Sequence, residues 1–159
     1  QPLRIESYGF VPDTGGPGKY RGSLGIEREY RLVGADEAVL QVRGDRHKFQ
    51  PFGLYGGKPG AFASSIINPN SEDEQIPPSK FMKTMKKGDL FRAQLAGGGG
   101  WGNPYERDPK RVIEDVKNGK ISSKAASKEY GVQIDENTMS VDEQATRNLR
   151  EAMANSNLN

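Results

Sequence analysis

The sequence predicts an α+β fold: a mostly antiparallel β part with glycine-rich loops, followed by two or three short C-terminal helices. The chain has 159 residues, the size of one domain or a little more. Its 20 glycines lie almost entirely before residue 103, and only Gly119 and Gly131 follow. Clear helix-capping patterns come after that point. We therefore expect one continuous unit with a β-rich glycine-loop part, 1–102, and a helical part, 103–159.

Short strands are predicted within the first part. Residues 3–8 alternate apolar and polar side chains, which is typical of a half-buried strand. Further extended segments are expected over 20–33, 38–43 and 90–95. Gly22 and Gly25 inside the second segment indicate bulges or close packing. The stretch 44–60 holds several glycines and two prolines, so we expect an ordered but irregular loop there.

The predicted helices are recognised by their ends. Asp108-Pro109 is typical of a helix N-terminus, and Gly119 fits the position just after the helix. Ser122 or Ser123 is expected to cap a second short helix. Residues 140–143 form a capping box for a third helix, with Ser140 as its N-cap. The apolar stripe of this third helix is thin, which favours loose docking or packing on a partner chain.

Composition argues against several classes of protein and partner. The 23 basic and 21 acidic residues leave a net charge of +2, too small an excess to indicate nucleic-acid binding. No apolar run approaches the roughly 18 residues of a membrane-spanning helix. With no cysteine and one histidine, thiolate and all-histidine metal sites are excluded. We therefore expect no nucleic acid, no membrane and no metal site for this chain.

Two features of the sequence bear on its origin. The absence of cysteine and of a signal-peptide pattern favours a reducing compartment, so a cytoplasmic location is expected. The chain opens with Gln1 and not with Met, which favours a processed chain or a piece of a larger one.

The first candidate site lies around Arg46, at the start of the glycine-rich loop. Asp45, Arg46, His47 and Lys48 bring one acidic and three potentially cationic side chains together. Such a cluster is suited to a carboxylate or phosphate group, with Arg46 as a bidentate fork and with Asp45 and His47 in secondary roles. A structural interpretation stays open, in which Arg46 pairs with Asp45 or another acid and pins the loop. A lone histidine such as His47 is itself more often structural.

The second candidate site is a run of four glycines: Gly97, Gly98, Gly99 and Gly100. Their amides have no side chain to shield them and are suited to an anion-binding nest or an oxyanion site. The alternative is that this run crosses tightly against another segment while Trp101 plugs the core.

Nucleotide-binding motifs are only approximated in this chain. Gly97 to Gly102 satisfies G-x-G-x-x-G, but the next helix begins too late for a dinucleotide site. The run 52–60 has Pro59 after Lys58 where a P-loop needs serine or threonine. We therefore expect no cofactor bound by this chain. Without cysteine or a second histidine, no nucleophile–base pair can be named, and the catalytic residues stay unknown.

An ordered set of motifs runs along nearly the whole chain and thins out after residue 134: 16–22, 24–26, 28–30, 45–46, 51–60, 87–89, 97–104, 106–109 and 125–132. Together these motifs resemble the C-terminal part of the hydantoinase B/oxoprolinase family, as found in N-methylhydantoinase B-type and in acetone or acetophenone carboxylase-type subunits. The family's B-type polypeptides are much longer than this chain, and their N-terminal portion is absent here.

This resemblance implies a role in a larger enzyme. Family members are ATP-dependent hydrolases of cyclic amides, such as hydantoins, 5-oxoproline and lactams, or ATP-dependent ketone carboxylases. The resemblance implies that a hydantoinase A-type partner holds ATP and Mg, and that any metal lies in the missing N-terminal portion of the B-type polypeptide. The chain is then a subunit or fragment of a cyclic-amide hydrolase and inactive by itself. A ketone carboxylase segment and a non-catalytic assembly module are the alternatives.

Overall fold

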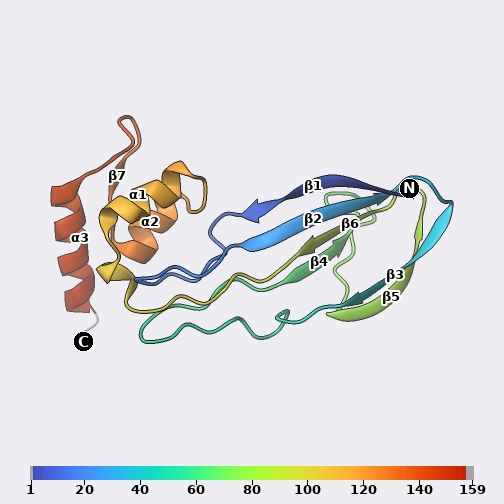
Figure 1. The fold of residues 1–159 in the computed structure, drawn as a ribbon, viewed down its shortest axis with the longest axis horizontal. Coiled ribbons are helices and arrows are strands. Elements are labelled where there is room, and N and C mark those ends of the chain that lie inside the picture. The colour runs from blue at the N-terminus through green and yellow to red at the C-terminus, as the bar shows by residue number, and fades with distance from the viewer. Residues whose placement is uncertain (1, 157–159) are drawn as a thin grey trace.

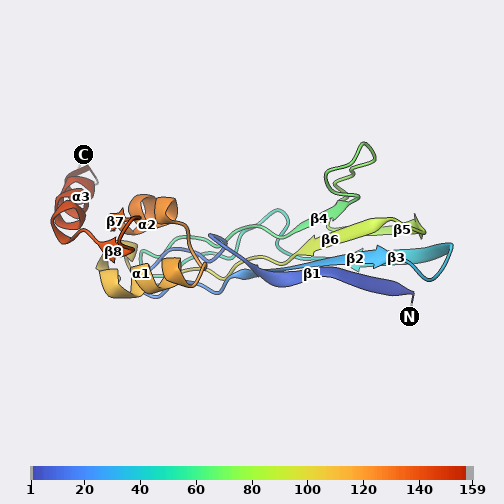
Figure 2. The ribbon, with the colours of Figure 1, turned by 90° about the horizontal axis from the view of Figure 1, so that it is seen from above.

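The computed structural model, which describes residues 2–156, is elongated, with sheets at one end and helices at the other (Figure 1, Figure 2). The strands of the first part are β1 (Leu3–Val11), β2 (Gly25–Leu32), β3 (Glu37–Arg43), β4 (Ser64–Ile67), β5 (Lys80–Lys86) and β6 (Leu90–Gln94). The last part holds the 3-10 helix η1 (Pro104–Glu106), α1 (Pro109–Lys117), α2 (Ser123–Tyr130), the short strands β7 (Ile134–Asp135) and β8 (Ser140–Val141), and α3 (Glu143–Ser156).

These elements confirm the predicted α+β class, because antiparallel strands fill the first part and the α-helices of the described range all follow it. The division into 1–102 and 103–159 stays a prediction, and residues 157–159 of the predicted helical part lie outside the described range.

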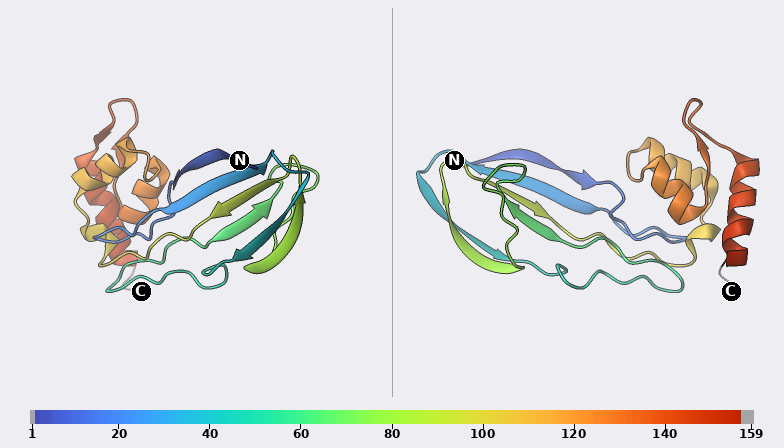
Figure 3. Two further views of the ribbon diagram at one scale, coloured as in Figure 1. Left: turned by 45° about the vertical axis from the view of Figure 1, so that its right-hand side comes forward. Right: turned by 180° about the vertical axis from the view of Figure 1, so that it is seen from behind.

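Two antiparallel sheets form the core of the β end (Figure 3). The larger sheet has the strand order β1-β2-β6-β4, and the smaller one pairs β3 with β5. Their facing sides meet in a core of buried residues: Leu32, Ile67, Met85 and Phe91. Strand β2 turns Tyr30 and Leu32 toward this core and Glu29 and Arg31 away from it, as the period of two in a strand requires.

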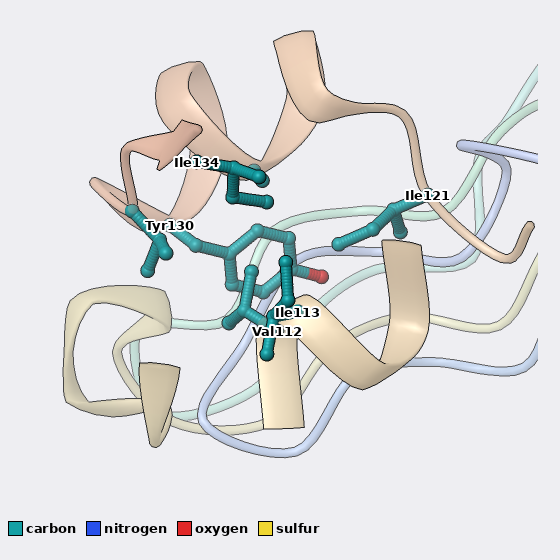
Figure 4. Packing of buried hydrophobic residues seen from close by; sticks show 7 residues of the cluster. Val112, Ile113, Ile121, Tyr130 and Ile134 are labelled. Atoms are coloured by element: carbon teal, nitrogen blue, oxygen red, sulfur yellow. The ribbon is translucent and has the colours of Figure 1, made fainter. Parts of the chain in front are cut away.

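A second hydrophobic core holds the helical end together. It is built from α1, α2 and the segment after them, with Tyr130 at its centre (Figure 4). Val112 and Ile113 of α1 and Ile121 pack around that ring. Burial raises the pKa of Tyr130 to about 12, so the phenol stays protonated at neutral pH.

The caps of α1 and α2 confirm the predicted starts of these helices. The Asp108 carboxylate accepts a bond from Lys110 N (2.9 Å), and Ser122 Oγ accepts one from Ala125 N (3.0 Å). The predicted start of the third helix at Ser140 is wrong. Asp142 caps α3, because its carboxylate accepts a bond from Ala145 N (2.9 Å), whereas Ser140 belongs to β8 and pairs with β7. The same polar residues occur in capping boxes and in short exposed strands, so the local sequence could not show which of the two Ser140 belongs to.

Three extended segments join the two ends of the molecule and hydrogen-bond to one another; we call them the glycine bundle and define it as residues 14–23, 51–61 and 97–102 (Figure 1). The bonds connect backbone groups, among them Gly98 N to Ser23 O (2.8 Å), Gly100 N to Lys58 O (2.9 Å) and Lys58 N to Pro17 O (2.7 Å). Each segment therefore bonds to both of the others, whereas in a flat three-stranded sheet the two outer strands do not meet.

Glycine is required where the backbones of this bundle cross. A Cβ on Gly97 would fall well inside van der Waals contact with the carbonyl oxygen of Thr14. One on Gly22 would collide in the same way with the carbonyl of Gly98. Because only glycine lacks a Cβ, three backbones can approach this closely, for the same steric reason that glycine recurs at the axis of collagen. The predicted close packing at Gly22 is confirmed.

A buried ion-pair network fastens the helical end to the bundle. Asp115 of α1, whose side chain is 6% exposed, accepts bonds from Arg107 Nη2 (2.8 Å) and Arg21 Nε (3.0 Å). Arg107 also donates to the carbonyl of Lys19 (3.0 Å). Burial alone would raise the pKa of the Asp115 carboxyl, but the bonds to Arg21 and the charge of Arg107 outweigh it, and the pKa is lowered. Asp115 is therefore ionised at neutral pH.

We expect Gly97→Ala to lower the free energy of unfolding by at least about 2 kcal/mol, because the backbone carbonyl of Thr14 cannot move aside as a flexible side chain would. Gly9→Ala in β1 is the matched control, since its added methyl meets nothing within 4 Å. Urea denaturation of both variants measures the difference. Equal stability of the two variants would contradict the tight crossing.

We expect Asp115→Asn to cost about 3–5 kcal/mol of stability at pH 7, because it breaks a buried ion pair from one side. The folded pKa of Asp115 lies below its unfolded value of about 3.9. The contribution of the carboxylate is therefore complete above that value and is lost as the pH falls through the folded pKa. Urea denaturation at pH 7 and at pH 3 should show a smaller gap between wild type and variant in acid.

The control for this substitution is Asp73→Asn, in an exposed loop, which should stay within about 0.5 kcal/mol of wild type at both pH values. A gap between wild type and Asp115→Asn that is the same at pH 3 as at pH 7 would refute the ion-pair assignment.

Candidate anion-binding site

Arg46 lies in the turn that follows β3, and backbone bonds fix this turn on both sides. Gly44 N donates to Ser79 O (2.7 Å), and Arg46 O accepts a bond from Ala63 N (3.1 Å). The backbone of Arg46 has a φ of 63°, in the left-handed region that residues other than glycine seldom adopt. Such conformations cost free energy and concentrate at functional sites. The turn thus holds Arg46 in a strained conformation.

The hollow around Arg46 is predominantly cationic. It has a volume of about 430 Å³ and is lined by residues 44–49, Ser79 and Lys80. Arg46 is exposed, and its guanidinium makes no hydrogen bond or ion pair with any residue of the described range. The pairing of Arg46 with Asp45, left open by the sequence, is therefore not observed. Four basic side chains and one acidic side chain give this hollow a charge suited to an anion.

His47 is held in a structural setting within the same turn. Its Nδ1 lies 3.0 Å from the carbonyl oxygen of Asp45, and its Nε2 lies 3.4 Å from Ser65 Oγ. Ser65 is only 3% exposed, so this serine and histidine cannot present a nucleophile to a substrate. The turn can bind and orient an anionic group, but it supplies no nucleophile–base pair.

The four glycines of the second candidate site lie apart from that hollow. None of Gly97, Gly98, Gly99 and Gly100 lines it. Three of their amides donate inside the bundle, to Ala61 O, Ser23 O and Lys58 O. Of these four amides, only that of Gly99 has no backbone acceptor among the described residues, whereas an anion nest needs several amides aimed at one point. The hydrogen bonds of the four glycines therefore correspond to a tight crossing of backbones. Their amides do not line the hollow around Arg46.

Trp101 does not plug the core, contrary to the alternative drawn from the sequence. Its side chain is 45% exposed and contacts Tyr20 and Tyr55, with ring centroids 5.5 and 5.4 Å apart. The physical reason is the thickness of the bundle. Three closely packed backbones leave no interior for an indole, so the side chain at this position points outward and forms an exposed aromatic cluster.

Sequence reasoning missed Ser79 and Lys80, which line the hollow from β5 and the residue before it. A signal was present, because Phe81, Lys83 and Met85 occupy alternate positions on the side of β5 that is more buried. The lysine within that apolar series hid the alternation. The fourth basic side chain of the hollow therefore came from a strand that the sequence did not reveal.

Residues 2–156 contain neither a cluster suited to a metal ion nor a helix suited to a membrane. Within that range, no group of three or more His, Cys, Asp or Glu side chains is placed to hold a metal ion. No helix of the same range combines the length and the apolar character needed to cross a membrane.

Comparison with known families, proteins and solved structures finds several relatives of this chain. The model of the family described as hydantoinase B/oxoprolinase matches residues 1–104. An uncharacterised protein of Methanocaldococcus jannaschii is 38% identical over 94% of this chain and 26% of its own length. The B component of a putative D-/L-hydantoinase from a Pseudomonas species is 33% identical over 94% of this chain and 25% of its own length.

Two solved structures share the fold. The ATP-dependent caprolactamase from Pseudomonas jessenii matches with a TM-score of 0.82 and 29% identity, over 94% of this chain and 26% of its own. Nucleotide-free acetone carboxylase matches with a TM-score of 0.85 and 24% identity, over 99% of this chain and 25% of its own, a likeness of fold. The chain thus spans about a quarter of the length of these four relatives. With its family model matched over 104 residues and these relatives along nearly all its length, the chain belongs to the hydantoinase B/oxoprolinase family.

Proposed function

We propose that this chain is a segment of the B-type polypeptide of an ATP-dependent cyclic-amide hydrolase, whose substrate is a hydantoin, 5-oxoproline or a lactam. The similarity to a putative hydantoinase and to an ATP-dependent caprolactamase supports this class of reaction. The ATP and Mg site belongs to a hydantoinase A-type partner, and any metal to the N-terminal portion of the B-type polypeptide. A location in the cytoplasm completes the proposal, because a chain without cysteine suits a reducing compartment.

Arg46 carries the proposed role of this segment. Its exposed, unpaired guanidinium in a strained and mostly cationic turn is the observation on which the proposal rests. A planar guanidinium binds a carboxylate or phosphate through two parallel hydrogen bonds. Arg46 therefore holds the anionic group of the activated intermediate, while Asp45 and His47 keep the turn in shape.

Two other functions have specific support. Sequence similarity to an acetone carboxylase alpha subunit of Xanthobacter autotrophicus, 27% identical over 84% of this chain, favours a ketone carboxylase segment, in which Arg46 would hold a carboxylate. The lack of an accessible nucleophile–base pair near Arg46 favours a non-catalytic assembly module. Activity of Arg46 variants distinguishes the module from both enzymes, since a module needs no anion-binding residue.

We expect Arg46→Ala to weaken substrate binding or turnover of the complete assembly about 10- to 100-fold, the effect of losing one hydrogen-bonded charge. Steady-state kinetics of ATP-dependent lactam hydrolysis measures it. Arg111→Ala, which alters another exposed arginine, on α1, is the control and should leave the kinetics unchanged.

Arg46→Gly separates binding from folding. Glycine adopts a φ of 63° without strain, so this variant should be as stable as wild type while losing activity like Arg46→Ala. Unchanged turnover and substrate affinity in both variants would exclude the role of Arg46.

We expect the isolated chain to hydrolyse no lactam with ATP, and activity to appear when the A-type partner and the N-terminal portion of the B-type polypeptide are added. Product formation followed by chromatography checks this. Hydrolysis by the chain alone would overturn its dependence on partners.

A further inference from the structure

Apolar side chains of β1 share one face of the larger sheet because of a β-bulge. Ile5 pairs with Tyr30, but after the bulge Tyr8 pairs with Arg28. Side chains alternate along a strand, so the extra residue returns the second half of β1 to the face of the first half. Four large side chains, each about half exposed or more, therefore lie in one row: Leu3, Ile5, Tyr8 and Phe10.

This row lies on the core side of the sheet. On the neighbouring strands the same face carries Tyr30, Leu32 and Phe91, which β3 and β5 cover. The opposite face carries ion pairs typical of a solvated surface, such as Arg92 with Glu29 (2.6 Å). The smaller sheet thus covers the larger one only in part and leaves the apolar row on β1 largely exposed, with Arg28 of β2 lying over the Tyr8 ring (4.4 Å to its centroid).

An apolar groove lies at the boundary of the covered region. Its volume is about 490 Å³, and its lining is mostly apolar. Leu3, Tyr30 and Leu32 of the larger sheet form one side, and the residues of β3 form the other. Contiguous exposed apolar surface of this kind is typical of interaction sites.

Strand β3 presents a free edge beside this groove. Within residues 2–156, β3 pairs with β5 alone. Lys87 N donates to Asp36 O (2.9 Å) and Gly44 N to Ser79 O (2.7 Å), so even-numbered residues point their backbone groups toward β5. Because antiparallel strands alternate in this respect, the amides of Val39 and Gln41 point to the free edge. An unpaired edge next to an apolar groove is the geometry of β-strand addition.

We propose that a β-strand from the part of the longer B-type polypeptide outside these 159 residues adds to the free edge of β3. Its backbone bonds to Val39 and Gln41, and its alternate apolar side chains cover Leu3 and Ile5. The four relatives described above are each about four times as long as this chain, so a B-type polypeptide of that length has many residues outside this segment that can supply a strand. The inference rests on the proposed membership of a B-type polypeptide and is independent of Arg46.

The test uses a chimera of the Pseudomonas jessenii caprolactamase in which this chain replaces the matching quarter. Hydrogen exchange should be at least about tenfold slower at the amides of Val39 and Gln41 in the chimera than in the isolated chain. Ile5→Asp should abolish this protection. Ile76→Asp, which alters another exposed isoleucine that lies outside β1, should not.

A second pair of variants tests the edge itself. Gln41→Pro removes an amide that does not bond to β5, so it should leave the isolated chain folded but lower the melting temperature of the chimera relative to Gln41→Ala. Equal melting temperatures of that pair, or unprotected edge amides, would overturn the proposal. So would protection in the isolated chain that rises with its concentration, which assigns the groove to a second copy.

If the chimera does not fold, the known caprolactamase structure decides: an open edge at the strand equivalent to β3 would overturn the proposal, and an added strand would support it. None of these measurements reads activity, so a failure here is distinguishable from a failure of the Arg46 assignment.

Discussion

The closed set of backbone hydrogen bonds among three glycine-rich segments is the constraint on which the rest of the structure depends. Without side chains between them, residues 14–23, 51–61 and 97–102 satisfy much of their hydrogen bonding with one another. Each such bond contributes only about 1 kcal/mol net, but leaving a buried amide unpaired costs more. The bundle therefore acts as a connector that sets the sheets at one end and the helices at the other, and the ion pairs of Asp115 fasten its helical end.

The open position of Arg46 limits how strongly the proposed site can hold an anion by itself. An ion pair at 4 Å is worth about 1 kcal/mol in bulk water but about 4 kcal/mol at the effective dielectric of a protein surface. The hollow around Arg46 is open, so water screens its charge. A partner that closes over this turn would exclude that water and strengthen the hold on an anionic group. Anion binding and assembly are thus linked physically in the proposed function.

The packing of the β end also favours contact with a larger assembly. A four-stranded sheet covered by a two-stranded one leaves apolar surface on β1 and a free edge on β3. Burying four such side chains would contribute several kcal/mol at roughly 1.5–3 kcal/mol for each fully buried one. This surface and the exposed aromatic cluster of Trp101 make the chain look like a part shaped to fit others. Two relatives from the comparison are about four times as long as this chain, which agrees with the proposal that it is a segment of a longer polypeptide.

The sequence alone determined the α+β class, the caps at Asp108 and Ser122, and the cationic turn at Arg46. Each of these features depends on residues that are close together in the chain. Tertiary structure alone decided what the glycines do. Their amides meet carbonyls dozens of residues away, which turned a plausible anion nest into a tight crossing and sent Trp101 outward. The same holds for Lys80, and for Asp115, whose partner Arg21 lies 94 positions earlier. Periodicity and caps carry no record of which distant segments pair, so these contacts were beyond prediction from sequence.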